Sequence, residues 1–191
     1  MSAHAAQRNP VALTAEKLRR QTAQEAEAAF EAAFRENWPR LVATLYRLVG
    51  EGAEAEDLAL ETFWRLHRNP LMLSDGAGLR GWLYRVATNL GLNALRARGR
   101  RQRYEEQAGS LDLQESRADD PAAEVERRQE RLRVRQGLAH IKPRSAQLLL
   151  LRHSGFSYAE IAAALGVAPA SVGALLARAE KEFEERYRKL E

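Results

Sequence analysis

Apolar residues recur at helical spacing along most of the chain beyond residue 24, and residues 79–103 are the clearest case. Positions i, i+4, i+7, i+11 and i+15 of this segment form one apolar stripe. They are Leu79, Leu83, Val86, Leu90 and Ala94. The segment therefore predicts a long helix with one side in a core, and the same periodicity elsewhere predicts an all-α protein.

Three more helices are expected before this one. The first begins at about residue 24 and breaks near Asn37 and Trp38, and the second has Pro39 in its first turn, where proline is favoured. Gly50 and Gly52 end the second helix. A third helix covers residues 53–67. The core residues expected from these helices are Phe30, Phe34, Leu41, Leu45, Leu48, Leu58, Phe63 and Leu66.

Residues 71–78 are expected to be a loop that carries Gly76 and Gly78. Met72 and its neighbours in this loop have two equally supported interpretations. They either cover the hydrophobic core or form a pocket beside the basic helix.

Composition divides the chain into two helical domains. Residues 1–23 are rich in Ala and Gln and predict a flexible tail or frayed helix, whereas residues 104–124 are acidic and predict a flexible linker. The expected domains are therefore residues 24–103 and 125–191. In the second, Lys142 and Pro143 separate a helix with periodic apolar residues from a short apolar helix over residues 145–153.

Residues 157–177 carry the most specific pattern in the sequence. Ser157 and Glu160 form a capping box, so a helix is expected to start at Tyr158. Ala162 is small enough to let two helices cross, Gly166 suits the turn, and Pro169 suits the first turn of the next helix. The apolar residues that would hold the pair together are Ile161, Leu165, Val167, Val172 and Leu175. A packing-only helical hairpin shares part of this pattern, but the complete register favours a DNA-binding helix-turn-helix.

The helix over residues 79–103 has a second stripe without a single acid: Trp82, Arg85, Asn89, Asn93, Arg96, Arg98, Arg100, Arg101 and Arg103. Aromatic rings stack on bases, amides reach base edges, and guanidinium groups hold phosphates. The alternative is the solvated face of an ordinary core helix. Because solvated faces usually mix charges of both signs, the stripe favours nucleic-acid binding.

Several classes of protein and site are disfavoured. The chain has no cysteine, which removes disulfides, thiol nucleophiles and thiolate metal sites. Its four histidines lack ligand spacing, and neither a Gly-rich phosphate loop nor a Ser/His/Asp set is evident. We therefore expect no catalytic residues, no metal and no cofactor. Without a long apolar run or secretory segment, a soluble cytoplasmic protein is expected, with no membrane partner.

Taken together, these motifs resemble the extracytoplasmic-function (ECF) branch of bacterial sigma factors. AEAEDLALETFWRL resembles the family's polymerase-binding segment, RGWLYRVATNLGLNALRARGRR its −10 reading and melting segment, and LLLLRHSGFSYAEIAAALGVAPASVGALLARA its −35 binding helix-turn-helix. The resemblance implies core RNA polymerase and promoter DNA as partners, single-stranded at −10 and double-stranded at −35. An anti-sigma factor is a further candidate partner.

The resemblance also implies site residues. Core polymerase would be bound by Glu54, Asp57, Leu60, Glu61, Phe63 and Trp64. The −10 element would be bound by Arg80, Trp82, Tyr84, Arg85, Asn89, Asn93, Arg96 and Arg100. The −35 element would be bound by Arg152, Ala170, Ser171, Arg178 and Lys181. Residues 71–78 would receive a flipped −10 base, and the acidic linker would thread the polymerase cleft.

Some residues depart from the family's pattern. Leu60 stands where Gln is usual, and Asn93 where Asp is common. The outward positions of the second helix of the helix-turn-helix cannot make a bidentate base contact: Ala168, Ala170, Ser171, Gly173, Ala174 and Ala177. Leu60 and the bare recognition helix keep one competitor open, a sigma-like decoy that binds core polymerase or an anti-sigma factor. A stand-alone helix-turn-helix regulator is the other alternative, but a recognition helix with almost no base-reading side chains and the single-stranded-DNA character of the first module count against it.

Overall fold

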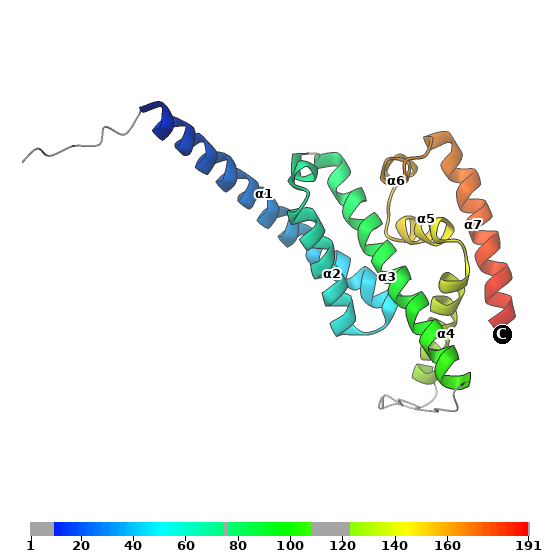
Figure 1. Cartoon of the computed structure of the whole chain (residues 1–191). Coiled ribbons are helices and arrows are strands. Elements are labelled where there is room, and N and C mark those ends of the chain that lie inside the picture. Colours follow the sequence, from blue (N-terminus) through cyan, green and yellow to red (C-terminus); the bar gives the residue numbers. More distant parts are fainter. Residues whose placement is uncertain (1–9, 75, 108–122, 191) are drawn as a thin grey trace, which may run out of the picture.

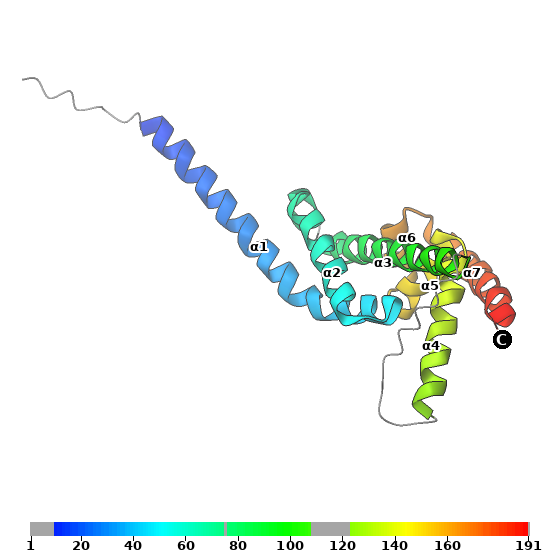
Figure 2. The same cartoon turned by 60° about the horizontal axis from the view of Figure 1, so that its bottom comes forward.

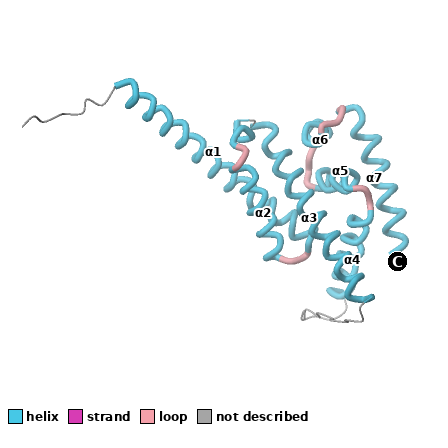
Figure 3. Tube along the Cα trace, in the orientation of Figure 1, coloured by secondary structure: helices cyan, strands magenta, loops and turns pink. Residues whose placement is uncertain are grey.

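The computed structural model describes residues 10–74, 76–107 and 123–190, and every regular element in them is helical (Figures 1 and 3). This confirms the predicted all-α class. The first module contains α1 (Pro10–Val49), α2 (Gly52–His67), the 3₁₀ turn η1 (Pro70–Ser74) and α3 (Gly76–Gln107). The second contains α4 (Ala123–His140), α5 (Pro143–His153), α6 (Tyr158–Leu165), η2 (Pro169–Ser171), α7 (Val172–Tyr187) and η3 (Arg188–Leu190).

Helix α1 runs through the position where a break was expected, so that prediction was wrong. Pro39 lies inside the helix rather than in the first turn of a new one. The ribbon of α1 bends in its second half (Figure 2), as helices commonly do at an internal proline. Buried Leu41 and Leu45 hold the part that follows Pro39 in the core, and this burial offsets the cost of the proline.

The ends of α1 and α2 agree better with the sequence. Gly50 has a φ of 87°, so the chain leaves α1 in a left-handed conformation that favours glycine. Helix α2 begins and ends within one residue of the prediction. Residues 71–74 belong to η1 and residues 76–78 to the first turn of α3, so the described part of the predicted loop is helical. Met72 and Leu73 pack half-buried against the core, which favours the core-covering interpretation.

The segments expected at the domain boundaries are partly helical. Helix α1 already starts at Pro10, α3 continues to Gln107 and α4 starts at Ala123. Residues 1–9 of the predicted tail and 108–122 of the predicted linker lie outside the described residues. The boundaries and the flexibility of both segments therefore stay predictions.

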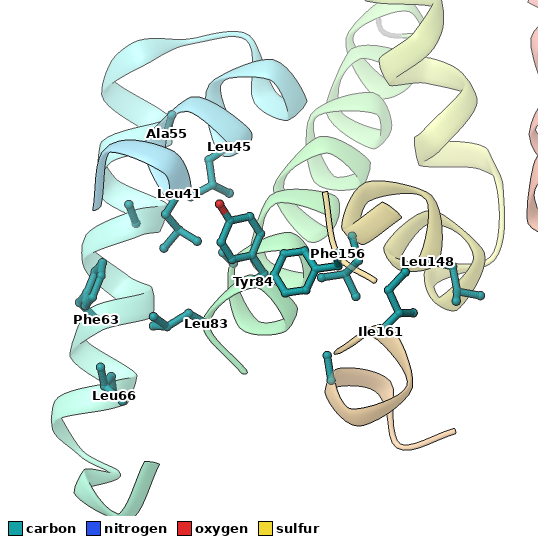
Figure 4. Close-up of a cluster of buried hydrophobic side chains, with 14 of the residues drawn as sticks. Leu41, Leu45, Ala55, Phe63, Leu66, Leu83, Tyr84, Leu148, Phe156 and Ile161 are labelled. Carbon is teal, nitrogen blue, oxygen red and sulfur yellow. The ribbon is translucent and has the colours of Figure 1, made fainter. Parts of the chain in front are cut away.

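One hydrophobic core extends through both modules (Figure 4). Leu41, Phe63 and Leu83 belong to its first-module part, whereas Leu148 and Ile161 belong to its second-module part. A smaller cluster joins Leu48 and Leu92 of the first module to Leu138, Ile141 and Ala146 of the second. The two modules thus pack against each other in this structure.

Packing on two sides changes the buried face of α3. Val86, Leu90 and Ala94 of the predicted stripe are only half-buried. The fully buried hydrophobic positions are Leu83, Tyr84, Ala87 and Leu92, with Thr88 beside them. Helices α1 and α2 contact α3 from one direction and α5 and α6 from another, so its buried surface is wider than one stripe.

Candidate nucleic-acid and partner-binding surfaces

The helix-turn-helix of the second module forms as its local sequence predicts. The Ser157 backbone N–H donates to the Glu160 carboxylate at 2.8 Å, and the Glu160 N–H donates to the Ser157 hydroxyl at 3.3 Å. The Ser157 hydroxyl also donates to the Glu160 carboxylate at 2.7 Å. This bond, then the one from the Ser157 backbone N–H and, more weakly, the charge of Arg80 lower the pKa of Glu160. Gly166 ends α6 in the left-handed conformation, with a φ of 63°. The predicted capping box and turn are confirmed.

The second helix of the helix-turn-helix presents small side chains to solvent. Pro169 begins the 3₁₀ turn η2 rather than α7 itself. Of the two residues of this helix that were predicted for the core, Val172 is buried and Leu175 is half-buried. Leu176, which was not predicted, is buried in the same cluster as Ile161 and Ala162. The exposed outward positions are Ala168, Ala170, Ser171, Ala174 and Ala177. Gly173 is half-buried, with space for a Cβ 3.6 Å from the Tyr158 ring.

The three cations that were predicted to contact phosphates lie near this surface. Arg178 and Lys181 are exposed on α7. Arg152, at the end of α5, donates a hydrogen bond to the Phe156 carbonyl at 3.4 Å and lies 5.4 Å from the Tyr158 ring centre. This places its charge beside the first turn of α6.

Helix α3 keeps half of its predicted reading residues accessible. Arg85, Asn89, Asn93 and Arg100 are exposed. The first three are spaced four residues apart, which places them in a row along one side of the helix. Trp82 is half-buried against the core and offers only part of its ring.

The other predicted reading residues of α3 are engaged inside the protein. Tyr84 is only 3% exposed, and its ring lies edge-on to Phe156 at 4.9 Å between centres. The proposed contact of Tyr84 with DNA is therefore not available in this arrangement. Arg96 donates to the carbonyls of Ala139 and Ile141 at 3.1 and 3.2 Å, and burial lowers its guanidinium pKa.

Two arginines of α3, Arg98 of the acid-free stripe and Arg80 before it, pair with acids of other helices. Arg98 donates to the Val49 carbonyl at 2.8 Å and pairs with Glu54 of α2. Arg80 pairs with Glu160 of α6 at 3.5 Å. Arg98 thus closes the C-terminal end of α1, a structural role that the sequence analysis missed because its partners are more than 40 residues away.

Helix α2 separates its two adjacent aromatic residues. Phe63 is 2% exposed and packs against Phe34, with ring centres 4.7 Å apart, whereas Trp64 is 57% exposed. Consecutive helical residues point about 100° apart, so one faces the core and the other solvent. Phe63 cannot reach a partner in this fold, which removes it from the predicted polymerase-binding set.

The outer face of α2 is otherwise available. Leu60 is 51% exposed, and Asp57 is also exposed. Glu61 is half-buried and accepts a hydrogen bond from Arg65 at 2.8 Å. Glu54 lies at the edge of this face and is held by Arg98. Two large apolar side chains among charged ones are typical of a protein-binding surface.

Other kinds of site are not evident in the part of the chain that the structure describes. No group of three or more acidic or histidine side chains there could hold a metal ion. Within the same residues, no single helix is both long and apolar enough to cross a membrane. A cavity of about 790 Å³ lies where α1, α4, α5 and α7 meet, lined by Leu48, Val134, Leu138 and Phe183 among others.

Comparison with known proteins agrees with these two helical modules. Residues 33–101 match Sigma-70 region 2, and residues 131–183 match Sigma-70, region 4. ECF RNA polymerase sigma factor SigG of Mycobacterium tuberculosis is 31% identical over 91% of this chain and 53% of its own length. The chain thus spans about half the length of that relative.

Two further proteins are similar over most of their own length. RNA polymerase sigma factor CarQ of Myxococcus xanthus is 31% identical over 83% of this chain and 87% of its own. The sigma factor RpoE of Bartonella quintana, solved in complex with the anti-sigma factor NepR, covers 88% of this chain and 98% of its own, at 22% identity and a TM-score of 0.44. From its sequence relatives and its two matching regions, this chain belongs to the ECF branch of the sigma-70 family of RNA polymerase sigma factors.

Proposed function

We propose that this protein is a non-enzymatic transcription initiation factor that binds core RNA polymerase, directs it to particular promoters and helps to open the −10 region. The observation that carries the proposal is that regions 2 and 4 of the family fall on the two modules that expose these surfaces. Region 2 supplies α2 and α3, and region 4 supplies the helix-turn-helix.

The proposed polymerase-binding surface is the outer face of α2. Trp64 and Leu60 form its apolar centre, and Asp57 and Glu61 supply negative charge beside them. Interfaces commonly draw most of their binding energy from a buried aromatic anchor surrounded by polar residues. Trp64 is the side chain that fits this role.

The proposed −10 surface is the exposed row on α3. The amides of Asn89 and Asn93 can hydrogen-bond base edges, while Arg85 and Arg100 can hold phosphates or stack on bases. Arg80, Trp82, Tyr84 and Arg96 extend this surface when the second module does not cover it.

The proposed −35 surface is the helix-turn-helix, which holds DNA mainly through phosphates. Candidate donors are the backbone amides near Ala170 and Ser171 and the side chains of Arg152, Arg178 and Lys181. Since phosphate contacts carry no direct sequence information, preference at −35 would come from groove shape and deformability. On the basis of family membership, we include an anti-sigma factor among the candidate partners.

Run-off transcription with purified bacterial core polymerase and a pool of genomic promoters tests this function. The expected result is a small set of transcripts that appear only when the protein is added. A protein that binds core without producing transcripts would be a decoy, and one that binds duplex DNA without core would be a stand-alone regulator. Either result would overturn the proposal.

A further inference from the structure

The cavity of about 790 Å³ at the junction of α1, α4, α5 and α7 lies apart from the exposed row of α3 and the outer face of α2. Its volume falls within the ~300–1,000 Å³ of small-molecule sites. Leu48 and Leu138 are buried, whereas the other apolar residues of the lining are half-buried and keep part of their surface open to a ligand. These others are Val134, Leu149, Leu150 and Phe183.

Most of the apolar lining is aliphatic. Its two aromatic residues are Tyr46 and Phe183, and the Phe183 ring already packs against the Tyr187 ring at 5.8 Å between centres. Sites for flat aromatic ligands usually present aromatic rings for stacking. A flexible aliphatic chain needs only contact with methyl and methylene groups, so it matches this lining better.

The charged side chains of the lining are mostly cations. They are Arg47, Glu130, Arg131, Arg135, Arg152, His153 and Glu180. One of the two glutamates is engaged by other groups, because Glu130 accepts a hydrogen bond from the Tyr187 hydroxyl at 2.5 Å and pairs with Arg133 at 3.3 Å. The excess of positive charge is complementary to a ligand with an anionic head.

Three of these arginines come from the place where α4 contacts the end of α1. Arg131 and Arg135 are four residues apart and therefore lie on the same side of α4. The Arg135 Nε donates to the Arg47 carbonyl at 3.0 Å, and the Arg47 side chain donates to the Thr44 hydroxyl at 3.3 Å. Among the described residues, neither Arg47 nor Arg135 is paired with a carboxylate.

The electrostatics of Arg135 show that this corner lacks an anion. Burial is the largest influence on its guanidinium and lowers the pKa. Tyr46 acts in the opposite direction, whereas the positive charges of Arg131 and Arg98 lower the pKa further. An anion bound here would offset the repulsion among these cations.

We propose that this cavity binds a medium-chain fatty acid as a free monomer, with the carboxylate on Arg47, Arg131 and Arg135 and the chain on the apolar lining. Guanidinium groups bind carboxylates through paired, charge-assisted hydrogen bonds. The chain would contact all four helices, so the bound acid stabilises the folded protein. This site goes beyond the proposed function, and its test uses neither DNA nor polymerase.

Isothermal titration calorimetry of the full chain with decanoate, kept below its critical micelle concentration, tests the proposal. We expect one acid to bind per chain, with a dissociation constant in the micromolar range, and the melting temperature to rise as decanoate is added. Decanol has the same chain without the charge and should bind at least tenfold more weakly. Absence of saturable decanoate binding would overturn the site, and equal binding of decanoate and decanol would overturn the role of the carboxylate.

A filled cavity tests where the chain lies. Val134→Trp puts a large ring into the lining and should weaken decanoate binding at least tenfold. Leu132→Trp is the matched control on the same helix, since Leu132 is 46% exposed and is not part of the lining, and it should bind as the natural protein does. Circular dichroism checks that both variants are folded. Unchanged binding by folded Val134→Trp would place the acid elsewhere and contradict the proposal.

A charge variant tests where the head lies, and it also decides the matter if Val134→Trp does not fold. The Arg47 side chain is exposed, so Arg47→Gln should keep the fold. It should weaken decanoate binding at least fivefold and leave decanol binding unchanged. Arg40→Gln, seven residues earlier on α1, exposed and outside the lining, should change neither. Equal decanoate affinities for the two variants would overturn the assignment of the head to this corner.

Discussion

The outer face of α2 and the proposed −10 surface of α3 belong to the same module but differ in how far other parts of the chain cover them. On α2, Trp64 and Leu60 stay exposed because no other part of the described chain covers them. On α3, Arg80 and Tyr84 pack against the Phe156 ring of the second module. Arg96 donates a hydrogen bond to the Ala139 carbonyl of the same module. The apolar surface of Trp64 and Leu60 would be buried only by another molecule. The cations and the phenol ring of α3, in contrast, have their binding partners within the same chain. The comparison shows that the outer face of α2 is exposed in this fold, whereas Arg80, Tyr84 and Arg96 of α3 contact the second module.

The largest expected effect concerns the folding side of α2. Phe63→Ala should lower the free energy of unfolding by about 3–5 kcal/mol, because the ring is buried among Phe30, Phe34 and Trp38. Urea denaturation followed by circular dichroism measures this. A loss below about 1 kcal/mol would contradict the assignment of Phe63 to the core.

The neighbouring substitution tests the binding side of the same helix. Trp64→Ala should weaken core polymerase binding by about 2–4 kcal/mol, the range of an interface anchor. Its free energy of unfolding should change by only about 0.5 kcal/mol, since the side chain is mostly exposed. Titration of labelled protein with core gives the affinity. Unchanged affinity would remove Trp64 from the proposed surface.

Substitutions in the exposed row of α3 should impair promoter opening and leave core binding intact, whereas Trp64→Ala should impair core binding. Arg85→Ala and Asn89→Ala should each make the free energy of opening the −10 region about 1–3 kcal/mol less favourable. Their affinity for core polymerase should stay unchanged. Permanganate footprinting and core titration of the same preparations provide the comparison. Equal losses in both assays would indicate misfolding rather than a lost DNA contact.

A smaller effect is expected for bases of the −35 element. Single changes there should cost less than the ~1–3 kcal/mol of a direct mismatch, because Ser171 is the only polar side chain among the outward residues of the recognition surface. Changes in the −10 element should cost more. A saturated promoter library transcribed with the holoenzyme measures both. A strict −35 sequence beside a permissive −10 would disprove the phosphate-based mode of binding.

The smallest effect concerns acid stability of the second module. Burial works to raise the pKa of Glu182, but hydrogen bonds from the Lys142 N–H and the Ser145 hydroxyl outweigh it and lower the pKa from its ordinary 4.5. A lowered folded-state pKa adds stability that is present above the unfolded value and lost as pH falls through the folded one.

The melting temperature should therefore decrease as pH falls from about 6 to about 3, and Glu182→Gln should reduce the slope of that decrease. Thermal unfolding of both proteins at several pH values measures it. Glu180→Gln, two residues earlier on α7 and exposed, is the control and should keep the natural slope. Identical slopes for Glu182→Gln and the natural protein would show that this carboxylate does not link α7 to α5.

Local pattern was a good guide wherever neighbouring residues decide the structure. The capping box at Ser157, the left-handed turn at Gly166 and the bounds of α2 all depend on interactions within a few residues. Pro39 shows the limit of such rules. The preference of Pro39 for the first turn of a helix is a local effect of a single residue. Burial of Leu41 and Leu45 over the following turns outweighs it and keeps α1 continuous.

The sequence by itself determined the helical class, the helix-turn-helix and the small side chains at its outward positions between residues 168 and 177, since these follow from residue identity and short-range spacing. Only the tertiary structure decided which of Phe63 and Trp64 faces solvent, because periodicity leaves both sides of α2 open to a core. It also decided that Arg80, Tyr84 and Arg96 face the second module. Their partners, such as Phe156 and the Ala139 carbonyl, lie more than 40 residues away and meet them only when the two modules pack.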